Sequence, residues 1–190
     1  MKLTTARLVL RELTSADLGA LAAIMQDGQT MVAYEGPFTD AEVADWLHRQ
    51  TTSYAVGLGL LAVVLPDTGQ VIGQCGLTWQ DIDGVRRLEV GYLFNRAFWR
   101  HGYATEAAAA ICDRAFADLA ANEVWAQVRD TNLASMNVAI RLGMVVRCRF
   151  TKHYRGIDMP HLGFAVTRDE WRRRQPGLTP TSRPRLLPQH

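Results

Sequence analysis

Hydrophobic and polar positions alternate along the first half of the chain in two different periods. In residues 7–13 (RLVLREL) apolar and charged side chains take turns, which predicts a first strand. Residues 14–27 and 38–50 instead place apolar side chains at helical intervals. Each of these segments opens with a capping-box spacing, Thr14 with Asp17 and Thr39 with Glu42. A strand followed by two helices is therefore expected, the second running on toward Tyr54.

The pattern after residue 57 predicts hairpins and further helices. Two apolar runs flank the turn sequence PDTG within residues 57–79, which is typical of a β-hairpin. The remaining segments are predicted as strands at 86–94, 123–129, 145–154 and 159–166, and as helices at 105–121, 132–144 and 167–174. Asn132 and Thr167 are expected to cap the last two helices, and Gly143 to end the helix that Asn132 begins.

This order of elements predicts an α/β (or α+β) fold around a mixed, mostly antiparallel sheet. Residues 1–174 are expected to form one domain, since no internal linker interrupts them. Residues 175–190 are rich in proline and basic side chains, and we expect them to form a separate C-terminal arm.

Composition narrows the class of protein. The chain has 190 residues, 48% of them hydrophobic, which suits one packed core, and its formal net charge of +2 gives no overall attraction for nucleic acid. Nucleic-acid binding through the basic arm is an alternative that salt-dependent binding would reveal. Neither a signal peptide nor a run of eighteen apolar residues is found, which favours a cytoplasmic protein without a membrane span. Cys75, Cys112 and Cys148 are expected to be reduced packing residues, and no metal site is expected.

The turn before the third predicted helix is a candidate anion site. Between the strand ending near Phe94 and the helix beginning near Thr105, the chain must turn sharply at Gly102. The first N–H groups of a helix lack internal partners and lie at the positive end of its dipole, as an anionic phosphate requires. Small side chains at Gly102 and Ala104 would let an anion approach the backbone. The alternative is an ordinary strand-to-helix turn that binds nothing.

Five segments in order decide between these interpretations. The stretch LEVGYLFNRAFWRHGYATEA resembles the acyl-CoA-binding segment of the GNAT superfamily of N-acetyltransferases, whose motif Gln/Arg-x-x-Gly-x-Gly/Ala falls on Trp99 to Ala104. Trp99 departs from the motif, although the RimJ/RimL-type branch (ribosomal-protein-alanine acetyltransferase-like) tolerates it. That branch is also similar at TTARLVLREL, VIGQCGL, VRDTNLASMNVAIRLGM and GFAVTRDEW. The resemblance covers residues 4–172, nearly the whole chain.

The resemblance implies a GNAT fold and a binding site for acetyl-CoA. In this family the co-substrate lies where two neighbouring parallel strands splay apart, here residues 88–94 and 124–129. Main-chain groups of the first strand would pair with the pantetheine arm, and the amides of the helix turn would meet the pyrophosphate. The residues concerned are Tyr92, Leu93 and Phe94 for the arm, and Arg100, His101, Gly102, Tyr103, Ala104 and Thr105 for the pyrophosphate.

Acetyl transfer to an amine needs a base, because amines are mostly protonated near neutral pH. Glu89 lies close to where some family members carry a glutamate base, and it is the first candidate. The alternative is an ion pair of Glu89 with Arg86, Arg87 or another cation. Many relatives have a glutamate on the next strand, where this chain has Gln127, which can only hydrogen-bond or position a substrate.

The helix after that strand is expected to serve the thioester end. In similar proteins the residue matching Asn132 caps the helix and also hydrogen-bonds the pantetheine arm, and Ser135 is the position that offers a hydroxyl to the CoA sulfur. A plain surface serine is the alternative for Ser135. Many relatives have a tyrosine that acts as the general acid at the position of Ala139. Because alanine cannot donate a proton, Ser135 or a water molecule becomes the expected proton donor. Asn137 is expected at the nucleotide end or in solvent.

The acceptor pocket is the least specified part. Its lining is expected among Tyr34, Glu35, Trp79, His153, Tyr154, Asp158 and His161, with carboxylates that would suit a cationic amine. The expected reaction is acetyl transfer to a protein N-terminus or a small-molecule amine by direct attack in a ternary complex. Transfer of a succinyl group and a non-catalytic acyl-CoA-binding protein are the alternatives. Exposed edge strands near the C-terminal hairpin leave a homodimer open.

Overall fold

The computed structural model describes residues 1–174, and the C-terminal arm predicted at 175–190 lies outside the described residues. Strands and helices alternate along the chain in the predicted manner. In chain order they are β1 (Lys2–Thr4), β2 (Val9–Arg11), α1 (Leu18–Met25), α2 (Asp40–Ser53), β3 (Gly59–Val64), β4 (Val71–Ile82), β5 (Val85–Phe94), α3 (Tyr103–Ala117), β6 (Glu123–Arg129), α4 (Leu133–Arg141), β7 (Val145–Tyr154), β8 (Ile157–Thr167) and α5 (Arg168–Arg174).

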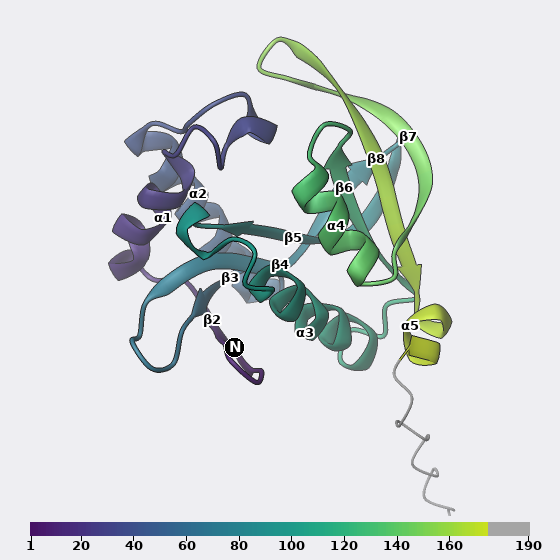
Figure 1. Cartoon of the computed structure of the whole chain (residues 1–190), viewed down its shortest axis with the longest axis horizontal. Coiled ribbons are helices and arrows are strands. Elements are labelled where there is room, and N and C mark those ends of the chain that lie inside the picture. The colour runs from purple at the N-terminus through teal and green to yellow at the C-terminus, as the bar shows by residue number, and fades with distance from the viewer. Residues whose placement is uncertain (175–190) are drawn as a thin grey trace, which may run out of the picture.

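One mixed sheet organises the described residues (Figure 1). Its strand order is β1-β2-β3-β4-β5-β6-β8-β7, and every neighbouring pair is antiparallel except β5 and β6. The parallel pair has a single registered position, Glu89 opposite Trp125. Beyond that position β5 stays with β4, whereas β6 follows β8, so the sheet opens between two parallel strands. This is the predicted fold class.

Helices cover both faces of the first half of the sheet. Alternate residues of β3 belong to two separate cores, with Leu61 and Val63 packed on the α3 side and Ala62 and Val64 on the α1–α2 side. This burial on both faces explains why β3 reads as a continuous apolar run rather than as an alternating one. The small side chains of α3 let that helix pack closely on β4 and β5.

Most predicted elements are confirmed, with shifted boundaries. The short β1 was not predicted, and α3 begins at Tyr103 and ends at Ala117, two residues earlier and four residues earlier than expected. Both threonine capping boxes are formed, and Gly143 ends α4 with a left-handed φ of 77°. The three cysteines are free thiols, as expected, two of them buried.

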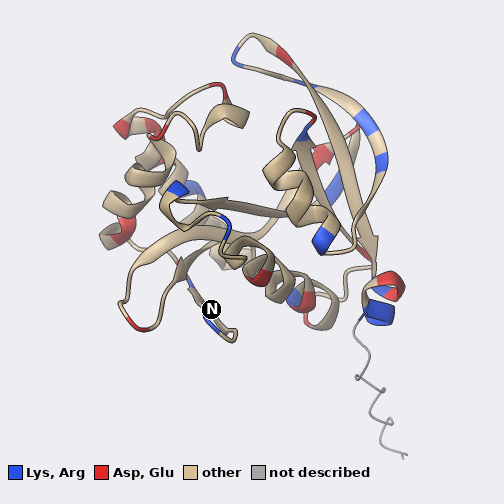
Figure 2. Cartoon of the chain, in the orientation of Figure 1, with Lys and Arg blue, Asp and Glu red and all other residues tan. Residues whose placement is uncertain are grey.

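Charged residues are spread over the molecule (Figure 2). Basic and acidic positions are interspersed on the helices and along the β7–β8 hairpin. No helix within residues 1–174 combines the length and the apolar character needed to cross a membrane. The same residues contain no group of histidine, cysteine or carboxylate side chains arranged to hold a metal ion.

Candidate active site

The opening between β5 and β6 leads into a cavity of about 670 Å³. Helix α4 lies beside β6, and β8 and β7 fan away from β5 on the same side (Figure 1). Eight of the helices and strands contribute to its wall, namely α2, β3, β4, β5, β6, α4, β7 and β8. The parallel pair thus places the centre of the sheet, where β-strand side chains are normally buried, in contact with a pocket.

Glu89 lies at the point where the two strands part. Its side chain is 8% exposed and lines the cavity. The Glu89 carboxylate accepts hydrogen bonds from the backbone N–H of Gln127 (3.1 Å) and from the Gln127 side-chain amide (3.3 Å). Burial raises the pKa of Glu89 to about 7, although the Gln127 bonds and the positive charge of Lys152 act in the opposite direction. The alternative of an ion pair with Arg86 or Arg87 is not what the structure has.

Gln127 holds Glu89 within a chain of amides. Its side-chain nitrogen also lies 3.3 Å from Gln80 Oε1, and its oxygen accepts a hydrogen bond of 3.4 Å from Lys152. Gln127 therefore joins β4, β5 and β7 across the opening. Sequence reasoning placed a hydrogen-bonding role on Gln127 but did not find Gln80 or Lys152, which no local motif marks.

Ser135 is joined to Tyr92 across the opening. Ser135 Oγ donates to the Tyr92 hydroxyl (3.1 Å), which in turn donates to the Ser135 carbonyl (2.9 Å). Asn132 caps α4 by accepting from the Ser135 backbone N–H at 3.1 Å, as predicted. Tyr92, Asn132 and Ser135 all line the cavity. The sequence predicted a mainly main-chain role for Tyr92 and did not reveal the contact of its hydroxyl with Ser135. Burial raises the pKa of this hydroxyl.

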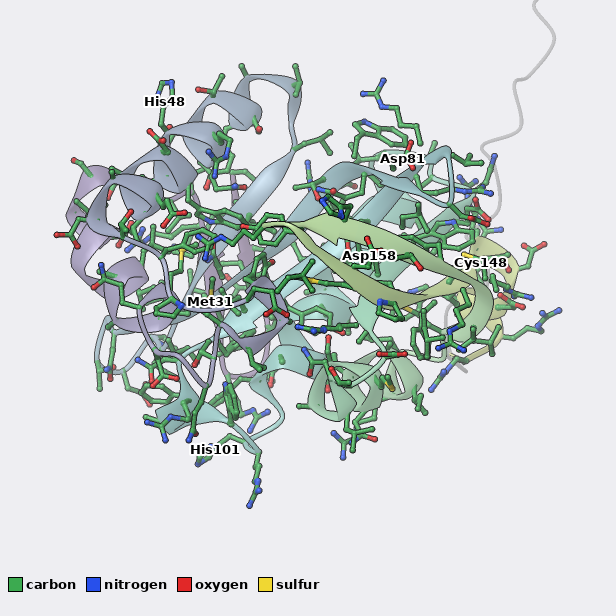
Figure 3. All side chains as sticks on the ribbon, turned by 90° about the horizontal axis from the view of Figure 1, so that it is seen from above. Met31, His48, Asp81, His101, Cys148 and Asp158 are labelled. Carbon is green, nitrogen blue, oxygen red and sulfur yellow. The ribbon has the colours of Figure 1, made fainter. Side chains whose placement is uncertain are left out.

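The α3 N-terminus lies after a tight turn. Gly102 precedes the helix with φ at 81°, and Arg100 is also left-handed at 66°. The first intrahelical bond runs from Glu106 N–H to the Gly102 carbonyl (3.0 Å), so the amides of Tyr103 to Thr105 have no acceptor within the helix. Leu93 belongs to the cavity wall and Phe94 to the core. Arg100 and His101 are exposed, and His101 lies at the periphery in Figure 3.

Arg7 brings a cation to this turn that the sequence did not reveal. Its guanidinium donates to the His101 carbonyl (3.0 Å) and lies 4.7 Å from the centre of the Tyr103 ring. Glu106 holds Arg7 through an ion pair of 2.7 Å. Burial alone would raise the pKa of Glu106, but hydrogen bonds from Thr5 and Arg7 bring it below its ordinary value. Glu106, in the first turn of α3, thus stays ionised, and Arg7 compensates its negative charge.

The predicted acceptor residues fall into two groups. Tyr34, Trp79, Tyr154 and His161 line the cavity. Glu35, His153 and Asp158 are not part of its wall: Glu35 pairs with Arg129, and His153 pairs with Asp158 at 2.9 Å on the exposed β7–β8 hairpin, where Figure 3 labels Asp158.

Two aromatic residues of the wall were missed. Trp46 packs edge-on against Tyr34 (6.3 Å between ring centres) and Phe38 (6.1 Å), and its indole N–H donates to the buried Gln74 at 2.8 Å. Both Phe38 and Trp46 line the cavity. The helical spacing of α2 could have indicated an inward Trp46, but only the loop before α2 brings Tyr34 and Phe38 to it.

An eight-stranded mixed sheet opened between two parallel strands, with α3 beginning beside the opening, is the architecture of an acetyltransferase of the GNAT class. Residues 7–145 match the family described as "Acetyltransferase (GNAT) domain", and the chain belongs to this family.

Two relatives are similar to this chain in sequence, and one solved structure is similar to it in fold. The chain is 32% identical to the protein YkkB of Bacillus subtilis over 145 residues, which are 75% of this chain and 84% of that protein. It is 32% identical over 163 residues to the FsC-acetyl coenzyme A-N(2)-transacetylase of Aspergillus fumigatus, covering 78% of this chain and 68% of that protein. A GNAT acetyltransferase crystal structure from Bacillus anthracis superposes with a TM-score of 0.78 at 21% identity, over 90% of this chain and 100% of that one.

Proposed function

We propose that this protein transfers the acetyl group of acetyl-CoA to the amine of a protein N-terminus or a small molecule, by direct attack in a ternary complex. The observation that carries the proposal is Glu89, a buried carboxylate with a pKa of about 7 that faces the cavity where β5 and β6 separate. A base with this pKa is half ionised near neutral pH, which suits proton transfer from an amine.

The residues present suit acetyl-CoA. The amides of Tyr103, Ala104 and Thr105 at the α3 N-terminus, with Arg7 beside them, would hold the pyrophosphate. Main-chain groups of Tyr92, Leu93 and Phe94 would hold the pantetheine arm, since β5 has no strand partner on the β6 side beyond Glu89 within the described residues. Acetyl-CoA supplies an activated acyl group. The Aspergillus fumigatus relative is named as an acetyl coenzyme A transacetylase.

Glu89 would accept the proton that the attacking amine loses. The amine nitrogen forms a bond to the thioester carbonyl carbon, and the carbon–sulfur bond breaks as the tetrahedral centre collapses. The amine proton then resides on Glu89, and Gln127 keeps the carboxylate oriented through its two hydrogen bonds. Holding both substrates in one cavity supplies a further part of the rate enhancement.

Ser135 and Tyr92 would serve the departing thiolate. Ser135 lies in the first turn of α4 on the cavity wall. Its hydroxyl, which donates to the Tyr92 hydroxyl in the structure, would turn its hydrogen toward the sulfur, while Tyr92 keeps its own bond to the Ser135 carbonyl. A hydroxyl that donates to a thiolate, or gives it a proton, stabilises the negative charge that develops on sulfur. Ser135 would thus take over the role of the tyrosine that many relatives have at the position of Ala139.

We also propose that the chain stands nearest to the RimJ/RimL-type branch and works in the cytoplasm. The motifs TTARLVLREL, VIGQCGL and GFAVTRDEW support the branch, and the three free thiols suit a reducing compartment.

The test is a thiol-release assay with acetyl-CoA and a panel of primary amines, with mass spectrometry of the acceptor. An N-acetylated product and stoichiometric CoA release are expected. CoA binding measured by calorimetry with no product from any amine would contradict catalysis and favour a non-catalytic acyl-CoA-binding protein. Turnover with succinyl-CoA in preference to acetyl-CoA would correct the donor.

A further inference from the structure

One face of the β6–β8–β7 part of the sheet lines the acceptor end of the cavity. Arg129 of β6 lies opposite His161 of β8, and Lys152 of β7 lies opposite Met159 of β8. Since side chains alternate along a strand, these four residues share a face, and all four belong to the cavity wall. Three of them, Arg129, Lys152 and His161, have nitrogen groups that carry a positive charge when protonated.

Lys152 and Arg129 are the two permanent cations of this face, and of the two Lys152 has no carboxylate partner in residues 1–174. Its side chain is partly buried, and its one hydrogen bond goes to the neutral amide of Gln127 at 3.4 Å. Arg129 is paired with Glu35, whereas burial lowers the pKa of His161 and keeps its ring neutral. An ammonium group withdrawn from water is costly unless an anion compensates it.

Glu89 does not supply that anion directly. Both of its oxygens are bonded to Gln127, and the Gln127 side chain separates them from the Lys152 ammonium. The Gln127 carboxamide thus has the proton acceptor Glu89 at its nitrogen end and the cation Lys152 at its oxygen end. Arg49, the other cavity-wall cation without a described carboxylate partner, is exposed on α2 and lies 5.7 Å from the centre of the Trp46 ring.

We propose that Lys152 binds a carboxylate of the acceptor, so that the acceptor is an amino acid with its amine and its free carboxylate a few bonds apart. The amine meets Glu89 while the carboxylate meets Lys152, and the Gln127 carboxamide sets the spacing. This inference rests on the proposed acetyl transfer and narrows it. A protein N-terminus or a lysine side chain within a polypeptide lacks this carboxylate and is disfavoured.

The first test compares matched acceptors and variants. Phenylalanine, leucine and β-alanine are each assayed against their own carboxamides with the wild type, Lys152→Met and Lys152→Arg. We expect the wild type to prefer the free acid, Lys152→Met to raise KM for the acid roughly 10- to 100-fold with little change for the amide, and Lys152→Arg to restore part of the preference. Equal use of acid and amide by the wild type, or an unchanged preference in Lys152→Met, would overturn the proposal.

The donor is the other source of a carboxylate. The same variants are therefore assayed with succinyl-CoA and an uncharged amine. If Lys152→Met abolishes succinyl transfer and leaves the acid preference intact, Lys152 binds the donor and the acceptor assignment is wrong.

A second test does not depend on turnover. The chain contains two lysines, Lys2 and Lys152, so acetic anhydride labelling followed by peptide mass spectrometry monitors the site with an internal control. With CoA present, phenylalanine is expected to protect Lys152, while Lys2 stays reactive and phenylalaninamide protects neither. Protection of Lys152 in a protein that shows no acetyl transfer would contradict the proposed function and support the carboxylate site. No protection of Lys152 by any of the three acids would contradict the carboxylate site even in an active enzyme.

Discussion

The Glu89 carboxylate and Gln127 are joined twice, once through the Gln127 backbone N–H at 3.1 Å and once through its side-chain amide at 3.3 Å. This pair bridges the only registered position of the two parallel strands within residues 1–174, the Glu89–Trp125 level. The same place where the sheet opens thus carries a buried acid whose two oxygens are already held. Orientation of Glu89 is a property of the fold and needs no bound acceptor.

Removal of the Gln127 amide is expected to shift the pH dependence of the reaction. In Gln127→Met the ionised Glu89 loses one donor, so its pKa rises above about 7 and the rising limb of kcat/KM moves to higher pH. A hydrogen bond to a charged group contributes about 1.5–3 kcal/mol, so the shift is roughly one pH unit or more. Gln80→Met, which does not touch Glu89, is the control. An unshifted limb in Gln127→Met would show that the Gln127 amide does not stabilise the ionised form of Glu89.

Replacement of Glu89 by the neutral glutamine is expected to stabilise the fold at alkaline pH. The pKa of Glu89 is raised from 4.5 to about 7, so the stability that its protonated form contributes is complete below pH 4.5 and is lost as the pH rises through 7. Relative to Glu89→Gln, the wild type should lose up to about 3 kcal/mol of unfolding free energy over this window. Urea unfolding of both proteins at pH 4.5 and pH 8 measures it. Parallel stability curves would mean that Glu89 titrates normally.

The turn at Gly102 should matter for CoA more than for the fold. Alanine at φ 81° costs about 1–2 kcal/mol and displaces the amides that open α3. Gly84→Ala is a matched control, since Gly84 has a φ of 74° in the β4–β5 turn with no atom near its added Cβ. Both variants should lower Tm, but only Gly102→Ala should weaken CoA binding, by roughly tenfold in calorimetry. Equal CoA affinity in the two would remove the α3 N-terminus from the site.

Ser135 and Tyr92 should act as one unit on the leaving group. Ser135→Ala and Tyr92→Phe are each expected to lower kcat roughly 10- to 100-fold with little change in CoA affinity, because the lost bond is made to developing charge. The double variant should be no worse than the poorer single variant, since the Tyr92 hydroxyl would act through the two hydrogen bonds that fix Ser135. Steady-state kinetics with calorimetry measures this. Additive losses would separate the two roles.

Local patterns were enough to predict most elements. The capping boxes at Thr14 and Thr39 and the glycine after α4 are determined by residues within one helical turn, and the structure has all three. Strand β1 was not predicted because its three residues are too few to establish an alternation of apolar and polar side chains. It becomes a strand through its pairing with β2.

The candidate site also contains residues that the sequence indicated and residues that only the folded structure brings together. Glu89 and Ser135 came from a resemblance that follows the order of segments, and their roles are predictions still to be tested. Lys152 and Arg7 were not predicted. Lys152 reaches the cavity through the register of β7 with β8, and Arg7 reaches the α3 turn through its contact with Glu106, which is far away in sequence. A similar cause misplaced His153 and Asp158, which adjoin Tyr154 and Met159 in sequence but point out of the cavity.

The pH dependence of kcat/KM for wild type and Glu89→Gln tests the proposed reaction most directly. The acceptor is the best substrate of the amine panel, and kcat/KM is expressed per neutral amine at each pH, so that the titration of the acceptor does not contribute. We expect wild-type activity to rise with an apparent pKa of about 7, and Glu89→Gln to lose roughly a hundredfold or more together with that limb. The same limb in both proteins, at similar rates, would contradict a general-base role for Glu89.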